Sequence, residues 1–319
     1  MLPRPSPSSV APAVPAAPAA PHSPLGAQIW LEPDDSAARV DQLCAHAAAS
    51  GLGWLRIFLM WPWIERTPEQ WDFTVFDHVF AAAEKHGLKI KATLTANSGP
   101  AWIGTPATLH SVSGFLSPDQ RAPMQRYIEK CVQRYVGSPA LAQWILWNEP
   151  AGGGDRTPET LARWREFLRE RYRGDLIALN HRWLTAFTDF NEIPFWNELP
   201  HTIHRGYHWN PYRAALDDAD FRPGWLGHEL RWIADLVRAL DPRSDLCINP
   251  TQVLANQAAG GTDLEDMGRI CEVIGASYHP AWQFSPFAQR ADYPALMSAG
   301  VRHCAVHPPV RRVEGTEVQ

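Results

Sequence analysis

The sequence predicts an α/β protein, and specifically a (β/α)8 TIM barrel, from three observations. First, short apolar strands alternate with amphipathic helices along most of the 319 residues, a pattern typical of a parallel sheet with right-handed crossovers. Second, the first strand–helix loops contain neither G-x-G-x-x-G nor G-x-x-x-x-G-K-[ST], so a doubly wound nucleotide-binding sheet lacks its usual signature. Third, polar residues recur where the predicted strands end, and barrels carry their active sites at that face. These residues are Asn97, Asn148, Glu149, Asn249, Tyr278 and His279.

The segment before the first strand has a different composition. Residues 1–25 consist almost wholly of Pro, Ala and Ser, and they lack the continuous apolar core of a signal peptide. Such a segment cannot bury enough apolar surface to become ordered. We therefore expect a disordered leader over residues 1–25 and a catalytic barrel domain over residues 26–319.

The predicted strands are short and mostly apolar, and Trp54–Leu59 (WLRIFL) and Leu141–Trp147 (LAQWILW) are typical of them. A complete barrel has an eighth strand, and no segment before Gln319 matches it. We therefore expect an incomplete barrel of about seven strands, truncated at its C-terminus. The seven strands are Ala27–Leu31, Trp54–Leu59, Lys89–Thr95, Leu141–Trp147, Asp245–Asn249, Val273–Tyr278 and Glu314–Val318.

Helices are predicted from apolar residues at a spacing of three to four and from residues that favour helix ends. Gly87 follows one such segment as a C-cap, and Thr157 with Pro158 opens another. An irregular, aromatic-rich region is expected before Pro223. The predicted helices are Ser36–Ser50, Phe73–His86, Pro118–Val136, Thr157–Tyr172, Asp175–Phe187, Pro223–Leu240 and Leu264–Ile270.

Composition excludes some classes of protein function. A net charge of −5 argues against the basic footprint of a nucleic-acid-binding protein, and no apolar run approaches the roughly 20 residues that span a bilayer. Five cysteines without a C-x-x-C pair suggest neither a disulfide framework nor a thiolate zinc site, and they favour a reducing, cytoplasmic location. The 15 tryptophans suit sugar stacking as well as core packing. Trp61, Trp102 and Trp282 follow strand ends and are candidate sugar platforms.

The stretch QWILWNEP, residues 143–150, carries the leading candidate for chemistry. Retaining glycoside hydrolysis requires two carboxyl groups about 5–5.5 Å apart, one acid/base and one nucleophile. Glu149 ends an apolar strand and is the first candidate, with the amide of Asn148 beside it to hold a sugar hydroxyl. Glu317, in the last predicted strand, is the candidate for the second carboxylate, and Glu314 is an alternative.

Several stretches together resemble clan A glycoside hydrolases and are most similar to family 42, the β-galactosidase family. They are GLGWLRIFLMWPWIERTPEQWDFTVFDHVFAAAEKHGLKI, TANSGPAW, WNEP, LARWREFLRERYRGDLIALNHRWLTAFTDFNEIP and SYHPAW. The resemblance covers roughly residues 26–300. It implies a retaining β-galactosidase that acts by double displacement. The alternatives are another clan A β-glycosidase, such as a β-mannanase or a β-glucosidase, and an inactive, truncated sugar-binding remnant.

The resemblance also implies roles for individual residues. Glu149 would be the acid/base and Glu317 the nucleophile, which Arg56 would steady by its charge. The cysteine cluster that often binds zinc in this family is replaced by AGGGD, so neither a metal nor another cofactor is implied. The implied partners are a carbohydrate substrate and further copies of the chain, as a trimer, with neither nucleic acid nor membrane. The implied substrate-binding residues are Arg56, Asn97, Asn148, Tyr278, His279 and Trp282.

Overall fold

The computed structural model describes residues 23–95, 99–103, 118–150, 157–199, 202–204, 207–209, 212–250, 263–278 and 312–318. Residues 1–22 of the predicted leader lie outside this part of the chain.

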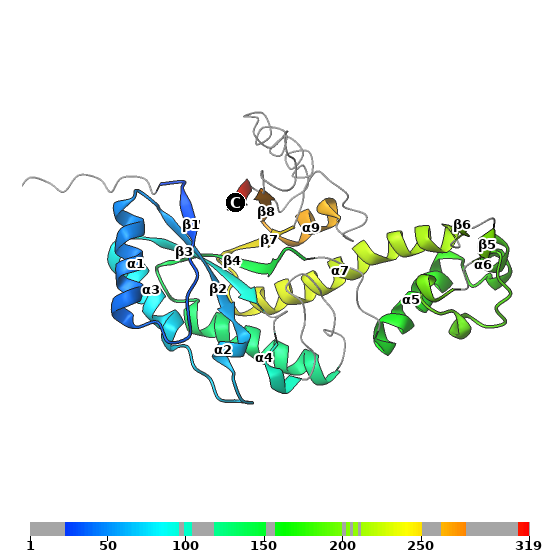
Figure 1. Ribbon diagram of the computed structural model, residues 1–319, viewed down its shortest axis with the longest axis horizontal. Helices are drawn as coiled ribbons and strands as arrows, with labels where there is room; N and C mark the ends of the chain where they lie inside the picture. The colour runs from blue at the N-terminus through cyan, green and yellow to red at the C-terminus, as the bar shows by residue number, and fades with distance from the viewer. Residues whose placement is uncertain are drawn as a thin grey trace, which may run out of the picture.

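A seven-stranded parallel sheet forms the framework, in the order β1-β2-β3-β4-β7-β8-β9 (Figure 1). Among the described residues no ladder joins β9 back to β1, so the sheet is a partial (β/α) barrel. The predicted barrel-type fold is confirmed, and each of the seven predicted strands overlaps an observed one, although the first ends at Gln28 and not at the predicted Leu31. The strands are β1 (Gly26–Gln28), β2 (Trp54–Met60), β3 (Lys89–Thr95), β4 (Leu141–Asn148), β7 (Asp245–Asn249), β8 (Val273–Tyr278) and β9 (Arg312–Val318).

The two faces of the sheet are used differently. In β2, Leu55, Ile57 and Leu59 are fully buried in the main hydrophobic core, which also includes α1, α3 and α4 residues. Arg56 and Phe58 alternate with them, because successive strand residues point to opposite faces. A polar residue such as Arg56 on the inner face is therefore the first sign of a site inside the half-barrel.

Helices cover the outer face of the sheet, and their ends follow the predicted caps. The Ser36 hydroxyl accepts a hydrogen bond from the Arg39 N–H, and Gly87 adopts a left-handed conformation with φ of 70° after α3. No described helix has the length and apolar character needed to cross a bilayer. The helices are α1 (Ala37–Ala49), α2 (Trp61–Ile64), α3 (Thr74–His86), α4 (Pro118–Tyr135), α5 (Pro158–Arg171), α6 (Leu176–Trp183), α7 (Tyr212–Leu240) and α9 (Leu264–Ile270), with 3-10 turns η1 (Ala101–Ile103), η2 (Phe190–Glu192) and η3 (Trp196–Glu198).

The predicted start of the longest helix is wrong. We expected a helix from Pro223, since proline favours the first turn, but α7 begins at Tyr212 and Pro223 lies inside it. Proline removes one backbone hydrogen bond from a helix interior. The neighbouring Phe221 and Trp225 are buried in a second hydrophobic core, and this packing maintains the helix through the proline.

This second core belongs to a helical excursion, which comprises α5, α6, η2, η3, the N-terminal half of α7 and a small hairpin. The hairpin pairs β5 (Thr202–His204) with β6 (Tyr207–Trp209) antiparallel, where the sequence predicted only irregular chain. In Figure 1 the excursion lies at the far end of α7 from the sheet. Its core is largely aromatic, with Trp164, Trp183 and Phe221 at its centre. Within the described residues, α7 contributes side chains to both the main core and this second core.

Candidate active site

Glu149 lies directly after β4, a central strand between β3 and β7. Its φ is 48°, a left-handed conformation that costs energy for a residue with a side chain, and Pro150 restricts it further. Its N–H donates a hydrogen bond to the Asn249 carbonyl on β7 at 2.8 Å, and the residue is only 7% exposed. Such a conformation persists only where the surrounding structure enforces it, and it is found most often at functional sites.

Arg56 fixes the residue beside Glu149. Its Nη2 donates to Asn148 Oδ1 at 2.8 Å, and its Nε donates to Thr93 Oγ1 at 3.1 Å. All three side chains are buried. The sequence placed Arg56 at the end of its strand, but it is the third of the seven residues of β2, and its long side chain reaches across to β4. One buried cation therefore ties together β2, β3 and β4 beneath Glu149.

Glu317 and Tyr278 are placed by strand register. Glu317 pairs with Ser277, and Tyr278, the last residue of β8, pairs with Val318. Glu314 pairs with Gly275, and a register shift between Ala276 and Ser277 then passes over Thr316 and brings Glu317 opposite Ser277. Because all seven strands are parallel, the end of β9 lies at the same edge of the sheet as Glu149.

The structure thus joins Arg56 by a hydrogen bond to Asn148, the residue before Glu149, and places Glu317 and Tyr278 at the same edge. Asn97, His279 and Trp282 lie outside the described residues.

Trp61 is not an open sugar platform, contrary to the prediction. It is 2% exposed, its ring stacks on Tyr127 at 5.1 Å between centroids, and its Nε1 donates to Glu65 Oε2 at 2.8 Å. Trp102 stands perpendicular to it and donates to the Glu65 carbonyl. Trp61 is buried because it follows β2 directly and begins α2, which turns the side chain into the main core.

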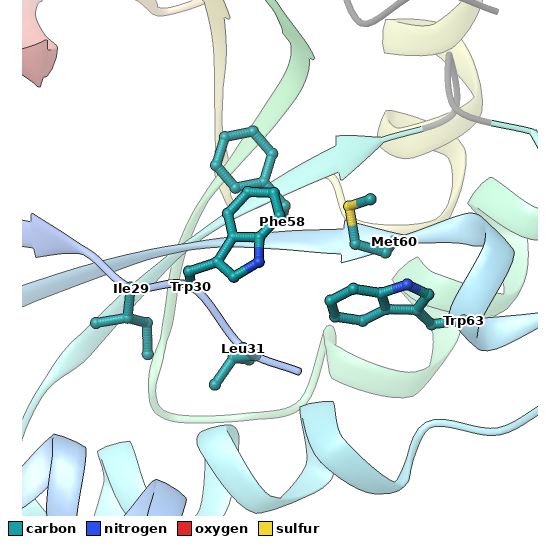
Figure 2. Close-up of a pocket in the computed structure, with 6 residues that line it drawn as sticks. All are labelled: Ile29, Trp30, Leu31, Phe58, Met60 and Trp63. Carbon is teal, nitrogen blue, oxygen red and sulfur yellow. The ribbon is translucent and has the colours of Figure 1, made fainter. Parts of the chain in front are cut away.

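Sequence reasoning missed an aromatic hollow at the ends of β1 and β2, shown in Figure 2. Trp30 is its most exposed member, at 57%. The available signal was the apolar run AQIWL, in which Trp30 comes two residues after the observed end of β1 at Gln28. The hollow is lined by Ile29, Trp30, Leu31, Phe58, Met60 and Trp63.

Within the described part of the chain, no group of three or more His, Cys, Asp and Glu side chains is arranged to hold a metal ion.

A buried Asn–Glu pair stands at the carboxyl end of a strand, the edge at which (β/α) barrels carry their active sites. The family model for glycoside hydrolase 42, described as beta-galactosidase, matches residues 40–217, more than half of the sequence. The chain belongs to this family, as the sequence motifs indicated.

Similar proteins include two kinds of enzyme. The probable mannan endo-1,4-beta-mannosidase A-1 of Aspergillus terreus is 28% identical over 162 residues, 42% of this chain and 40% of that protein. Beta-galactosidase GalA of Bacillus licheniformis is 20% identical over 280 residues, 79% of this chain and 39% of that protein. The chain therefore spans about two fifths of the length of these relatives.

Among solved structures, the β-galactosidase of the psychrophilic Marinomonas ef1 superposes with a TM-score of 0.72 at 20% identity. The match covers 92% of this chain and 48% of that one. At this identity the likeness establishes the fold, and it agrees with the predicted barrel.

Proposed function

We propose that the protein is a retaining glycoside hydrolase that removes terminal β-galactosyl units. Glu149 would serve as the acid/base and Glu317 as the nucleophile. Membership of the glycoside hydrolase 42 family supports the reaction class. The single observation that carries the assignment of Glu149 is its enforced left-handed backbone at the end of a central, buried strand.

The reaction would proceed in two displacements. Glu149 donates its proton to the glycosidic oxygen while a Glu317 carboxylate oxygen attacks the anomeric carbon, and the bond to the leaving group breaks. Glu149, now a carboxylate, then removes a proton from water, which attacks the same carbon and releases the sugar and Glu317. Asn148 presents its amide N–H group to a substrate hydroxyl, because Arg56 already engages its Oδ1.

Glu149→Gln tests the acid/base role, since it keeps the shape of the side chain and removes the titrating proton. We expect turnover of a β-galactoside with a poor leaving group to fall about 1,000-fold, within the range for loss of a general acid–base group. Turnover close to that of the wild type would rule out the role of Glu149.

Azide as an external nucleophile distinguishes the roles of the two carboxylates. In Glu149→Ala, azide should replace water in the second displacement and give the β-galactosyl azide. In Glu317→Ala, azide should attack directly and give the α-galactosyl azide. Glu314→Ala is the matched control. An α-azide product from Glu314→Ala in place of Glu317→Ala would assign the nucleophile to Glu314.

A second candidate is a β-mannoside-cleaving activity, because relatives named mannan endo-1,4-beta-mannosidases match at 28–37% identity. Aryl β-galactoside, β-mannoside and β-glucoside substrates distinguish the candidates by their kcat/KM values. Sugar binding with no turnover of any of them would favour a sugar-binding protein instead of an enzyme.

We also propose a cytoplasmic location and a trimeric assembly. The four described cysteines, Cys44, Cys131, Cys247 and Cys271, are buried thiols that are in no disulfide, which fits a reducing compartment. The trimer rests on the family resemblance alone. Light scattering of the purified chain tests it, and a monomeric mass would exclude it.

A further inference from the structure

The helical excursion contains a pocket whose charged lining is mainly positive. It lies between the end of α5, the turn that follows, α6 and the start of α7, and its volume is about 1010 Å³. This volume is at the upper end of the range for small-molecule pockets, so a ligand of several rings can enter it. In Figure 1, α6 lies at the far end of α7 from the sheet, so the pocket is remote from Glu149. The charged lining residues, besides one histidine, are Arg171, Arg173, Arg182, Arg213 and Asp175.

Most of the positive charge in this arginine pocket is not balanced by carboxylates. Arg171 is neutralised by Asp217, at 2.8 Å, and by Asp220, at 2.6 Å. Asp175 is engaged as the N-cap of α6, where its Oδ1 accepts a hydrogen bond from the helix backbone at 2.9 Å. The other three arginines are exposed and form no ion pair within the described residues. They are Arg173, Arg182 and Arg213.

This excess of positive charge favours an anionic ligand. The whole chain carries a net charge of −5, so the concentration of arginine is a local property of the pocket. Neighbouring guanidinium groups repel one another, and a bound anion removes this repulsion. Each guanidinium also presents a planar fork of donors that matches the two oxygens of a carboxylate. The arginine pocket can therefore hold a ligand with two or three such anionic groups.

The remaining lining residues favour a carbohydrate over a nucleic acid. Ile177, which is 83% exposed, and Ala178 give the pocket an apolar strip on which the C–H face of a sugar ring can lie. Tyr172 is the only Phe, Tyr or Trp in the lining, and it is partly buried with its hydroxyl donating to Asp217. The pocket thus lacks the exposed aromatic rings on which nucleic-acid bases stack, and the negative net charge of the chain repels a long polyanion.

We infer that the arginine pocket binds a short oligosaccharide whose units carry carboxylate groups, at a site separate from the one that cleaves the glycosidic bond. The arginines engage the carboxylates, and Ile177 contacts a ring face. The protein would in this way hold the acidic part of a polysaccharide while its active site acts on another part. The choice of a carbohydrate as the ligand rests on the proposed glycosidase function.

Isothermal titration of the full-length chain with α-1,4-trigalacturonate tests this inference. The α-linkage keeps the probe from being a substrate of the proposed β-galactosidase, and α-1,4-galactotriose is the neutral probe of the same size. Trigalacturonate should bind at least about tenfold more tightly than galactotriose, the scale of a hydrogen bond between charged groups. Its affinity should fall as the salt concentration rises.

Variants locate the site. Arg182→Gln and Arg213→Gln should each weaken trigalacturonate binding about tenfold. Arg182→Lys keeps the charge and loses the planar fork, so its loss should be intermediate. Arg163→Gln is the matched control, because Arg163 is an exposed arginine of α5 that pairs with Glu166 and does not line the pocket. It should retain the full affinity, and all four variants should hydrolyse a neutral aryl β-galactoside as the wild type does.

Three results would overturn the inference. The first is no binding of trigalacturonate at millimolar concentration, or binding no tighter than that of galactotriose. The second is an affinity that Arg182→Gln and Arg213→Gln leave unchanged. The third is tighter binding of tripolyphosphate or of a short single-stranded DNA, which would make the pocket a phosphate or nucleic-acid site. The proposed function fails separately, when the wild-type chain hydrolyses no glycoside although trigalacturonate binds.

Discussion

Two buried charged side chains organise the two regions of the molecule in different ways. Arg56, on the inner face of the sheet, contacts a hydroxyl of β3 and an amide oxygen of β4. Asp217, inside the helical excursion, forms an ion pair with Arg171 at 2.8 Å and accepts hydrogen bonds from the Tyr172 hydroxyl at 2.6 Å and the Trp183 indole at 2.8 Å. Each charge links three elements, but only Arg56 does so beside the candidate catalytic residue.

Arg56 and Asp217 should therefore affect different properties of the protein, namely catalysis and stability. Removing Arg56 releases Asn148, so the effect should appear mainly in turnover. Removing Asp217 releases α5 and α6 from α7, far from the sheet edge, so the effect should appear mainly in the free energy of unfolding.

Of the two buried charges, Arg56 should have the larger effect on activity, and Arg56→Met tests it. We expect kcat/KM for an aryl β-galactoside to fall about 100-fold, the scale for loss of one preorganised polar group at a reacting centre. Arg56→Lys keeps the charge but not the fork that reaches both Thr93 and Asn148, so its loss should be intermediate. A kcat/KM equal to that of the wild type in Arg56→Met would show that Arg56 is only structural.

Asp217→Asn should have the largest effect on stability. We expect the free energy of unfolding in urea to fall by about 3 kcal/mol, because a fully buried carboxylate that pairs with Arg171 and accepts two further hydrogen bonds loses its charge. Asp220 also pairs with Arg171, at 2.6 Å, but its side chain is 56% exposed. Asp220→Asn is therefore the matched control, with an expected loss of no more than about 1 kcal/mol. Equal losses in the two variants would contradict the distinction.

Tyr172→Phe should have the smallest effect, about 1 kcal/mol at neutral pH, and it should change the response to alkali. Burial and the neighbouring Asp217 raise the pKa of Tyr172 from 10.0 to about 12. The unfolded chain releases this proton more readily than the folded chain. The contribution of Tyr172 is therefore complete below pH 10 and is lost as the pH rises toward about 12.

Urea unfolding across this pH range measures the effect. Tyr172→Phe should lose less stability between pH 10 and about 12 than the wild type does. An identical slope in both proteins would show that Tyr172 does not carry this dependence.

Local patterns predicted most of the framework. The strands Lys89–Thr95, Asp245–Asn249 and Val273–Tyr278 match in every residue, because apolar runs bounded by caps and glycines are local signals. The start of α7 could not be predicted, because Phe221 and Trp225 keep it helical by packing on residues distant in sequence. Tertiary packing overrode the local meaning of Pro223.

The site residues could be predicted where a single short sequence motif contains them. WNEP was sufficient to select Glu149, and the family motifs pointed to Arg56. The hydrogen bond from Arg56 to Asn148 joins residues 92 positions apart, and no sequence pattern specifies that distance. The burial of Trp61 and the exposure of Trp30 could likewise not be predicted from the sequence. Both residues come at or after the end of a strand, and they differ in what packs against them.

The left-handed backbone at Glu149 has a consequence for how this protein can change. Glycine would adopt that conformation without the roughly 1–2 kcal/mol that a side chain costs there. Glycine would therefore relieve backbone strain at the very residue whose carboxylate is proposed to transfer the proton. Selection for stability and selection for catalysis would favour different residues at this position. Position 149 should therefore be kept as glutamate in a search for thermostable variants.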